Sequence, residues 1–394
     1  MVRSWEGIAI VLSPEIAGRV HIQDALAKRG SPGSRYRVAT PAAIVDLDIL
    51  ERNMAVVAGL LKGRPIKLRP HTKSHKCSYL AQLQTKAGAI GVCCAKLGEA
   101  EVMVENGIQS ILLTSPIFGA ETVARALRLA TAIPDFALVV DNPAAVNQLG
   151  SEAQTHSFIL SVLIDVDVGQ RRTGVVSPAK AIELARAIAL QPFLKLRGVQ
   201  GYGGSWQHIQ GAEARYAAVA EGMGKLGNVI SALRAEGFAV PVVTGGGTGS
   251  LSADLSLSVL NELQLGSYIF MDREYQEALG LEGPKFQTSL FVQAQVISAN
   301  QAEHVTLDAG LKAFATDGPA PRPASAGFED CEYRFFGDEF GLLTGGNRQI
   351  ALGDRIEFEV PHCDPTVDRY DVLHLVRGDV LVEIVPVEGR GRSQ

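Results

Sequence analysis

The sequence of 394 residues has little charge, few aromatic side chains and no long apolar run. Only 20% of its residues are charged, and they form no long block of one sign. This composition argues against a disordered chain and against a strongly basic nucleic-acid-binding protein. No stretch supplies the roughly 18 uncharged apolar residues that a membrane-spanning helix needs. We therefore expect neither a membrane anchor nor a nucleic-acid partner.

Cysteine is also scarce. The five cysteines are an odd number and lack the paired spacing of a zinc finger, which favours reduced thiols over a disulfide framework. The apolar run at 7–13 is followed by Pro14 and Glu15, and Arg3 is the only basic residue before it, so no secretion signal is expected. Together these features predict a cytoplasmic protein.

Glycine, by contrast, is abundant. Its 41 residues are clustered and show no period of three, which excludes a collagen-like chain. Clustered glycines instead indicate places where the backbone comes close to a ligand.

Short apolar runs alternate with helical patterns between about residues 48 and 266. Asp48 with Glu51 predicts the capped start of one helix, and Ser177 before Pro178 predicts the start of another. This α/β alternation predicts a (β/α)8 barrel over 48–268, with a doubly wound open sheet as the alternative. The eight candidate strands are 66–69, 89–93, 110–114, 136–140, 159–166, 196–201, 242–244 and 262–265.

The remaining residues have a different pattern. Segments rich in Val, Ile and Phe at 289–298, 304–307, 354–360 and 372–387 predict a β domain over 269–394. The proline-rich run 317–328 is expected to be an irregular loop. Residues 1–47, with a strand-like run at 43–47, lie outside the barrel repeat, and we expect them to join the β domain.

A basic run, LRPHTKSHK at 68–76, follows the first candidate strand. Active sites of barrels lie at the carboxyl ends of the strands, so its position indicates function. One interpretation is metal binding by His71 and His75, although Pro70 argues against a helix that would place both on one face. A basic loop without a catalytic role is the second. The third is a Schiff-base lysine, Lys73, with its pKa lowered and its amine freed by cationic neighbours. Those neighbours are Arg69, His71, His75 and Lys76.

A glycine-rich run, TGGGTGS at 244–250, follows the seventh candidate strand. It matches neither the dinucleotide-binding fingerprint nor a P-loop. Its backbone N–H groups and hydroxyls suit a phosphate, and barrels often bind phosphate after strands seven and eight. The alternative is a turn with no ligand. A phosphate site and a candidate Schiff-base lysine at one end of a barrel together point to pyridoxal phosphate.

The run PHCDP at 361–365 lies in the expected β domain. In an extended strand His362 and Asp364 would face one side and Cys363 the other. A histidine and a carboxylate suit Mn²⁺, Mg²⁺ or Zn²⁺, with water or substrate completing the shell. The alternative is a turn with a hydrogen-bonded histidine.

Three further residues follow the fifth and sixth candidate strands. Arg172 could neutralise an anionic oxygen, Tyr202 could pack on a cofactor ring, and His208 could titrate near neutral pH as an acid or base. Each taken singly also fits a structural role.

A series of short motifs runs in order from about Thr40 to Asp371. Together they resemble the metal-activated D-threonine aldolase family, whose relatives include the eukaryotic-type D-serine dehydratases and the 3-hydroxy-D-aspartate aldolases and dehydratases. The motifs are Thr40-Pro41, RPHTKSHK at 69–76, GVCC at 91–94, RTG at 172–174, QGY at 200–202, GGGTG at 245–249, ELQLGSY at 262–268 and HCDP at 362–365.

The resemblance implies an alanine-racemase-like fold: a pyridoxal-phosphate barrel and a β domain, working as a homodimer with active sites near the subunit interface. It implies that Lys73 is the Schiff-base lysine, that Arg172 lies near the cofactor's hydroxyl and that Tyr202 contacts its ring. The implied phosphate loop is Gly246, Gly247, Thr248 and Gly249.

The resemblance also implies a divalent metal on His362 and Asp364. The related dehydratases typically have cysteine at the second position and use Zn²⁺. An aspartate there favours an aldolase that prefers Mn²⁺ or a similar ion such as Mg²⁺ or Co²⁺.

The implied reaction is retro-aldol cleavage of D-threonine, or of a related D-β-hydroxy-α-amino acid, to glycine and an aldehyde. The cofactor accepts the electrons of the broken Cα–Cβ bond, the metal lowers the pKa of the β-hydroxyl, and His208 or a metal-bound water takes its proton. The alternatives are a 3-hydroxy-D-aspartate aldolase and a D-serine or 3-hydroxy-D-aspartate dehydratase. From another class, a non-enzymatic pyridoxal-phosphate-binding protein would lack the second domain.

Two positions depart from the family pattern. Arg171 stands beside Arg172 where relatives often have glycine, and Trp206 places an indole near the expected substrate entrance. Either could shift the preferred substrate towards a β-carboxylate or a β-aryl group.

Overall fold

Eight parallel strands form the barrel in the computed structural model, which describes residues 7–280, 283–346 and 349–394. The order around the sheet is β2-β9-β8-β7-β6-β5-β4-β3, and a parallel bridge between His71 and Cys93 joins the two ends. All eight candidate strands are present, and the closed barrel rules out the open sheet. The strands are β2 (Lys67–Leu68), β3 (Val92–Cys94), β4 (Ser110–Leu113), β5 (Asp135–Val140), β6 (Leu160–Asp165), β7 (Leu194–Gly201), β8 (Val242–Gly245) and β9 (Glu262–Leu263).

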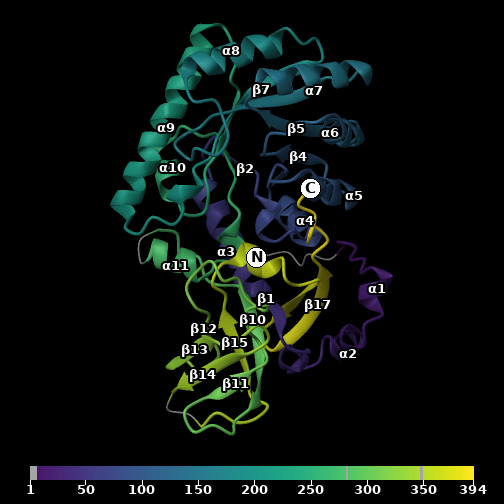
Figure 1. Cartoon of the computed structure of the whole chain (residues 1–394), viewed down its shortest axis with the longest axis vertical. Coiled ribbons are helices and arrows are strands. Elements are labelled where there is room, and N and C mark those ends of the chain that lie inside the picture. The colour runs from purple at the N-terminus through teal and green to yellow at the C-terminus, as the bar shows by residue number, and fades with distance from the viewer. Residues whose placement is uncertain (1–6, 281–282, 347–348) are drawn as a thin grey trace.

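Helices surround this barrel, and their starts follow local capping signals (Figure 1). Ser177 Oγ accepts the N–H of Lys180, as its position before Pro178 predicts. The first helix begins earlier than expected, because the cap is Asp46 and not Asp48: Asp46 Oδ1 accepts the N–H of Ile49 at 3.2 Å. The helices are α3 (Leu47–Leu61), α4 (Ser78–Lys86), α5 (Leu97–Glu105), α6 (Ala120–Ala132), α7 (Pro143–Thr155), α8 (Pro178–Ala189), α9 (Ala212–Ala235) and α10 (Leu251–Leu257).

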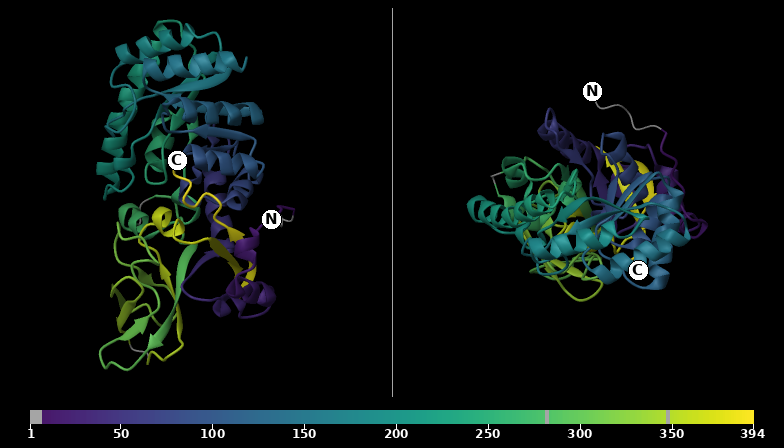
Figure 2. Two further views of the ribbon diagram at one scale, coloured as in Figure 1. Left: turned by 45° about the vertical axis from the view of Figure 1, so that its right-hand side comes forward. Right: turned by 90° about the horizontal axis from the view of Figure 1, so that it is seen from above.

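A separate sheet of nine strands forms the second domain, which lies below the barrel in Figure 1 and in the left view of Figure 2. Its main path is β13-β14-β11-β10-β1-β16-β17, while β15 pairs with β10 and β12. Its strands are β1 (Ala42–Asp46), β10 (Leu290–Ser298), β11 (Val305–Leu307), β12 (Arg322–Pro323), β13 (Cys331–Phe335), β14 (Gly341–Gly345), β15 (Arg355–Glu359), β16 (Val372–Arg377) and β17 (Val380–Pro386).

The N-terminal segment packs against this sheet. Strand β1 lies between β10 and β16, and helices α1 (Pro14–Ala17) and α2 (Val20–Lys28) precede it. The buried Arg35 guanidinium binds both carboxylate oxygens of Glu357 at 2.7 and 2.8 Å, which ties residues before β1 to β15. A double hydrogen bond of this kind fixes orientation as well as position.

The chain crosses between the domains more than once. After β9 it leaves the barrel through a short 3-10 turn, η4 (Ser267–Ile269), and helix α11 (Arg273–Leu279). After β17 it returns to the barrel, where the carbonyl of Gln394 accepts the N–H of Gly98 at 2.8 Å. The C-terminal end accordingly lies beside α5 in Figure 1. No helix among the described residues combines the length and apolar character that crossing a bilayer requires.

A buried ion pair fills part of the barrel interior. The side chains of Arg69 and Glu262 are 3% and 6% exposed, with Arg69 Nε 3.2 Å from Glu262 Oε1, and Asp135 lies 3.5 Å from the same guanidinium. Removing one partner of such a pair leaves an uncompensated buried charge. We expect Glu262→Gln to lower the free energy of unfolding by about 3 kcal/mol, measured by urea denaturation.

The matched control is Glu183→Gln, because Glu183 pairs with Lys180 on the surface, where both side chains are more than half exposed. That change should cost less than about 1 kcal/mol. Equal losses in the two variants would contradict a stabilising role for the buried pair.

Candidate active site

The loop after β2 carries Lys73 on a 3-10 turn, η2 (Thr72–Ser74), at the carboxyl end of the barrel. Thr72 fixes this turn: its hydroxyl contacts the carbonyl of Cys93 at 3.0 Å and Glu99 Oε1 at 2.5 Å. The carboxylate of Glu99 is itself buried and also accepts the N–H of Ala95 at 2.8 Å. The backbone around Lys73 is therefore anchored to strand β3 and to the start of helix α5.

The amine of Lys73 forms an ion pair with Asp364, which the β domain carries to the barrel mouth. Asp364 lies in the short helix α12 (Cys363–Val367), and 291 positions separate the two residues in the sequence. Burial disfavours the charged amine, but the carboxylate of Asp364 outweighs it and raises the pKa of Lys73 above its ordinary value. Lys73 is therefore a charged amine paired with Asp364.

The expectation that cationic neighbours lower the pKa of Lys73 is wrong, because those neighbours are neutral or paired. Burial lowers the pKa of His71 to about 3 and that of His75 to about 4, so both imidazoles are uncharged at neutral pH. Lys76 Nζ lies 2.9 Å from Asp368, and Arg69 is paired inside the barrel.

The alternative of a metal held by His71 and His75 finds no support in the geometry. Nδ1 of His75 accepts the N–H of Cys77 at 3.1 Å and its Nε2 contacts Gln84 at 3.2 Å. His71 Nε2 contacts Thr114 Oγ1 at 3.1 Å. Both rings are held by protein hydrogen bonds.

A cavity of about 240 Å³ opens beside Lys73. Arg172 and Tyr202 line it, and the guanidinium of Arg172 lies over the Tyr202 ring at 5.6 Å from its centroid. No pattern in the sequence distinguishes the polar residues that complete the lining, although Gln200 lies in the QGY motif and Gln264 in the ELQLGSY motif. The polar lining residues are His71, Lys73, Thr114, Ser115, Arg172, Gln200, Tyr202 and Gln264.

The glycine-rich loop follows β8 and packs tightly against Gln207. A Cβ at Gly247 would lie 2.4 Å from the Gln207 side chain, and one at Gly249 would lie 2.0 Å from the Gln207 carbonyl oxygen. Gly246 has φ +73°, which favours glycine. Close approach therefore requires glycine at these positions.

The loop also presents an unsatisfied hydroxyl. Thr248 is 1% exposed, and its Oγ1 has no hydrogen-bond partner among the residues that the structure describes. The N–H groups of Gly247 and Gly249 already bind Ser250 Oγ and Gln207 Oε1, at 3.0 and 2.9 Å. A buried hydroxyl without a protein partner needs a water or a ligand oxygen, and a phosphate oxygen would meet this need.

Thr248→Val should weaken binding of pyridoxal phosphate by about five- to tenfold, the equivalent of one hydrogen bond. Equilibrium dialysis of the cofactor against the apoprotein measures this. Thr155→Val is the matched control, because the Thr155 hydroxyl binds a carbonyl of its own helix on the surface. Equal affinity in the Thr248 variant and the wild type would remove Thr248 from the phosphate site.

His362 and Asp364 lie at the start of α12 and not in an extended strand, since His362 is the residue that precedes the helix. His362 Nδ1 lies 2.9 Å from Asp317 Oδ2 and 3.8 Å from Glu274 Oε2. Neither acid is distinguished by the sequence: Asp317 falls in the run expected to be an irregular loop, and Glu274 follows the barrel repeat. Burial opposes the charged imidazole, but Asp364 and Asp317 raise the pKa of His362.

Within the described ranges, no set of three or more His, Cys, Asp or Glu side chains could hold a metal ion. The side chains present, one imidazole beside carboxylates, are of the types that can coordinate Mn²⁺ or Mg²⁺. A site of two protein ligands, His362 and Asp364, remains a prediction.

His208 lies next to this pair. Its ring centroid is 6.3 Å from that of His362 and 4.5 Å from that of Tyr275, and its Nδ1 is 3.4 Å from Glu274 Oε1. Burial, followed by the charges of His362 and Lys73, lowers the pKa of His208 to about 4. The expected titration of His208 near neutral pH is therefore wrong, because its imidazole is neutral at that pH.

Trp206 was expected near the substrate entrance, but its indole is buried. It is 6% exposed and packs in the main core, where a Cβ at Gly222 of α9 would lie 2.2 Å from its indole. Arg171 is exposed, and its backbone N–H binds Asp167 Oδ1 at 2.9 Å.

Comparison with known proteins places this geometry in a family. The family model of the alanine racemase N-terminal domain matches residues 45–274, and that of a putative serine dehydratase domain matches 289–376. A D-threonine aldolase of an Arthrobacter species is 35% identical over 94% of this chain and 98% of its own. A 3-hydroxy-D-aspartate aldolase of Paracoccus denitrificans is 33% identical over 90% of this chain and 93% of its own.

The chain belongs to this alanine-racemase-like family of D-threonine and 3-hydroxy-D-aspartate aldolases. The crystal structure of the D-threonine aldolase from Filomicrobium marinum superposes with a TM-score of 0.86 at 35% identity, covering 91% of this chain and 97% of that one. The predicted family, fold class and lyase class are confirmed at this level, and the family and fold support pyridoxal phosphate as the cofactor.

Proposed function

We propose that the chain is a pyridoxal-phosphate-dependent aldolase that cleaves D-threonine, or a related D-β-hydroxy-α-amino acid, to glycine and an aldehyde with the help of a divalent metal. The observation that carries this proposal is the meeting of Lys73 and Asp364 at the barrel mouth, which brings a candidate cofactor lysine and a candidate metal ligand from two domains into contact. The similarity to aldolases over nine tenths of the chain supports the reaction class.

Different residues around the cavity would bind different parts of the cofactor. Lys73 would attach it through Nζ, Thr248 and its loop would bind the phosphate, and Arg172 and Tyr202 would border the ring. When bound, pyridoxal phosphate supplies an electron sink for the carbanion that cleavage of Cα–Cβ leaves behind. The neutral imidazole of His71, beside Lys73, adds no competing charge.

A second group of residues would act on the β-hydroxyl of the substrate. His362 and Asp364 would hold the metal, with Mn²⁺ expected first and Mg²⁺, Co²⁺ or Zn²⁺ as alternatives. A bound divalent ion lowers the pKa of a coordinated hydroxyl. His208 is neutral at pH 7 and lies beside His362, so its ring can accept the hydroxyl proton.

A second substrate class has a specific observation in its favour. The β-carboxylate of 3-hydroxy-D-aspartate would pair well with a cation, and Arg172 lines the cavity, with the exposed Arg171 next to it in the sequence. The relative from Paracoccus denitrificans carries that activity in its name. The homodimer and the cytoplasmic location stay predictions.

The deciding experiment is to incubate the holoprotein and Mn²⁺ with D-threonine, D-phenylserine, D-serine and 3-hydroxy-D-aspartate, and to identify the carbon products. Glycine with an aldehyde is expected for at least one of them. Pyruvate or oxaloacetate with ammonia would show elimination and overturn the aldolase. No product from any substrate, with and without Mn²⁺, would point to a non-enzymatic pyridoxal-phosphate-binding protein.

A further inference from the structure

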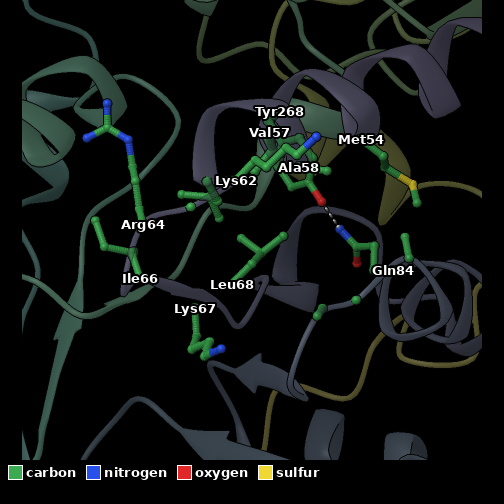
Figure 3. A pocket seen from close by; sticks show the side chains of 15 residues that line it. Met54, Val57, Ala58, Lys62, Arg64, Ile66, Lys67, Leu68, Gln84 and Tyr268 are labelled. Carbon is green, nitrogen blue, oxygen red and sulfur yellow. Dashed lines mark hydrogen bonds between the residues drawn. The ribbon is translucent and has the colours of Figure 1, made fainter.

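A second cavity, of about 380 Å³, lies between helices α3 and α4 beside strand β2 (Figure 3). It is larger than the cavity at Lys73, and none of the predicted site residues lines it. A volume of this size lies within the range of small-molecule sites. A ligand bound in this cavity would therefore be distinct from the substrate at Lys73.

The inner walls are apolar. Met54 and Val57 from α3 and Ile66 before β2 are buried, and Leu61 and Leu68 are partly buried against the same core. A hydrocarbon chain or ring placed there would exchange water for these side chains, which favours binding in proportion to the apolar area covered.

The rim is cationic. Lys62 and Lys67 are exposed, lie on opposite sides of the pocket in Figure 3, and form no ion pair with a carboxylate in the described parts of the chain. Arg64 is turned aside, and its guanidinium donates to the carbonyl of Leu255 at 3.3 Å. No aspartate or glutamate lines the pocket, so its charge complements an anion.

A directed hydrogen-bond chain leads from the pocket to the lysine loop. His75 Nδ1 accepts the N–H of Cys77, so the neutral ring must carry its hydrogen on Nε2 and donate it to Gln84 Oε1 at 3.2 Å. Gln84 Nε2 then donates to the Tyr268 hydroxyl at 3.0 Å, and both Gln84 and Tyr268 line the pocket (Figure 3). His75 lies two residues after Lys73.

We propose that this pocket is an accessory site for a small amphipathic anion, a carboxylate on a short apolar chain, and that its occupation stabilises the Lys73 loop through Tyr268, Gln84 and His75. The apolar part would lie against α3 and β2, and the carboxylate would lie between Lys62 and Lys67. The site is independent of which amino acid the active site cleaves.

Binding is tested by calorimetry on the holoprotein with octanoate as the probe and 1-octanol as the uncharged comparison. Octanoate should saturate, and 1-octanol should bind at least tenfold more weakly. The double variant Lys62→Ala/Lys67→Ala should weaken octanoate at least tenfold, and Ala58→Trp should block it, because Ala58 is an exposed helix residue that lines the pocket.

The matched control is the double variant Lys195→Ala/Lys225→Ala, which removes two exposed lysines away from the pocket and should leave octanoate binding unchanged. No saturation below about 10 mM octanoate would overturn the site. Undiminished binding in the Lys62/Lys67 variant would overturn the role of the two lysines.

The coupling has its own readout, hydrogen exchange of the peptide that contains residues 72–77. Octanoate should slow exchange at the Cys77 amide severalfold, because that N–H is held by His75. Tyr268→Phe keeps the ring and removes the hydroxyl, so octanoate should still bind but no longer slow the exchange. Equal slowing in this variant, or none in the wild type, would overturn the coupling.

Discussion

Replacing Lys73 by alanine should reduce turnover by roughly four powers of ten, the scale seen when a covalent nucleophile is removed. Lys73 is the candidate attachment point for the cofactor's aldehyde, and it lines the cavity that Arg172 and Tyr202 border. Without it, pyridoxal phosphate would be held by noncovalent contacts alone, so the visible absorption of the lysine-bound cofactor should disappear.

Lys76→Ala is the control, since Lys76 is three residues away and its amine binds Asp368 at 2.9 Å outside the cavity lining. That variant should keep the cofactor absorption and turnover within about threefold of the wild type, as expected for a partly exposed ion pair. Full turnover and an unchanged cofactor spectrum in the Lys73 variant would contradict the assignment of Lys73 as the residue that attaches the cofactor.

Asp364→Asn should reduce Mn²⁺-dependent turnover by roughly two to three powers of ten and weaken Mn²⁺ binding by at least about a hundredfold. The change removes the charged ligand of a predicted two-residue site and leaves a single histidine. Titration of Mn²⁺ by electron paramagnetic resonance measures the affinity directly, without reference to activity.

Although Asp364→Asn should lower turnover and weaken Mn²⁺ binding, it should speed the attachment of the cofactor to Lys73. Burial by itself would lower the pKa of Lys73, but Asp364 raises it. In the wild-type apoprotein a smaller fraction of Lys73 is therefore the uncharged amine at a given pH than it would be without Asp364. In Asp364→Asn that pKa falls, so at pH 8 the variant should take up pyridoxal phosphate on Lys73 at least about tenfold faster, with the rate profile shifted to lower pH.

Asp368→Asn is the control for both measurements. Asp368 lies four residues further along the chain and pairs with Lys76, so neither Mn²⁺ binding nor cofactor uptake should change by more than about threefold. A Lys73 uptake profile that did not move in Asp364→Asn would contradict the ion pair as the cause of the raised pKa.

Most barrel elements could be predicted because their signals are local. A strand with both faces buried is a continuous apolar run, and a helix start carries its own cap, as at Ser177. The strands β13 and β14 were missed although Cys331–Phe335 alternates buried and exposed residues, because that alternation is short and Gly341–Gly345 begins and ends in glycine. The helix cap at Asp46 could not be predicted, because Asp48, two residues later, carries the same side chain and could cap a helix equally well.

The charge of the site could not be predicted, because it depends on contacts between distant parts of the chain. Four cationic residues near Lys73 in the sequence suggest a depressed pKa, yet two of them are neutralised by burial and two by carboxylates. Trp206 is a similar case, since only the packing of α9 against it shows that the indole lies in the core.

The sequence by itself determined the order of strands and helices, the position of Lys73 and the glycine loop at one end of a barrel, and the family to which the chain belongs. These follow from side-chain periodicity and short motifs, which are properties of neighbouring residues. Only the tertiary structure decided that Asp364 meets Lys73, that Asp317 and Glu274 stand beside His362, and that His208 is neutral. The physical reason is that burial and charge at a site are set by what the folded chain brings within a few ångströms, and here two domains supply it.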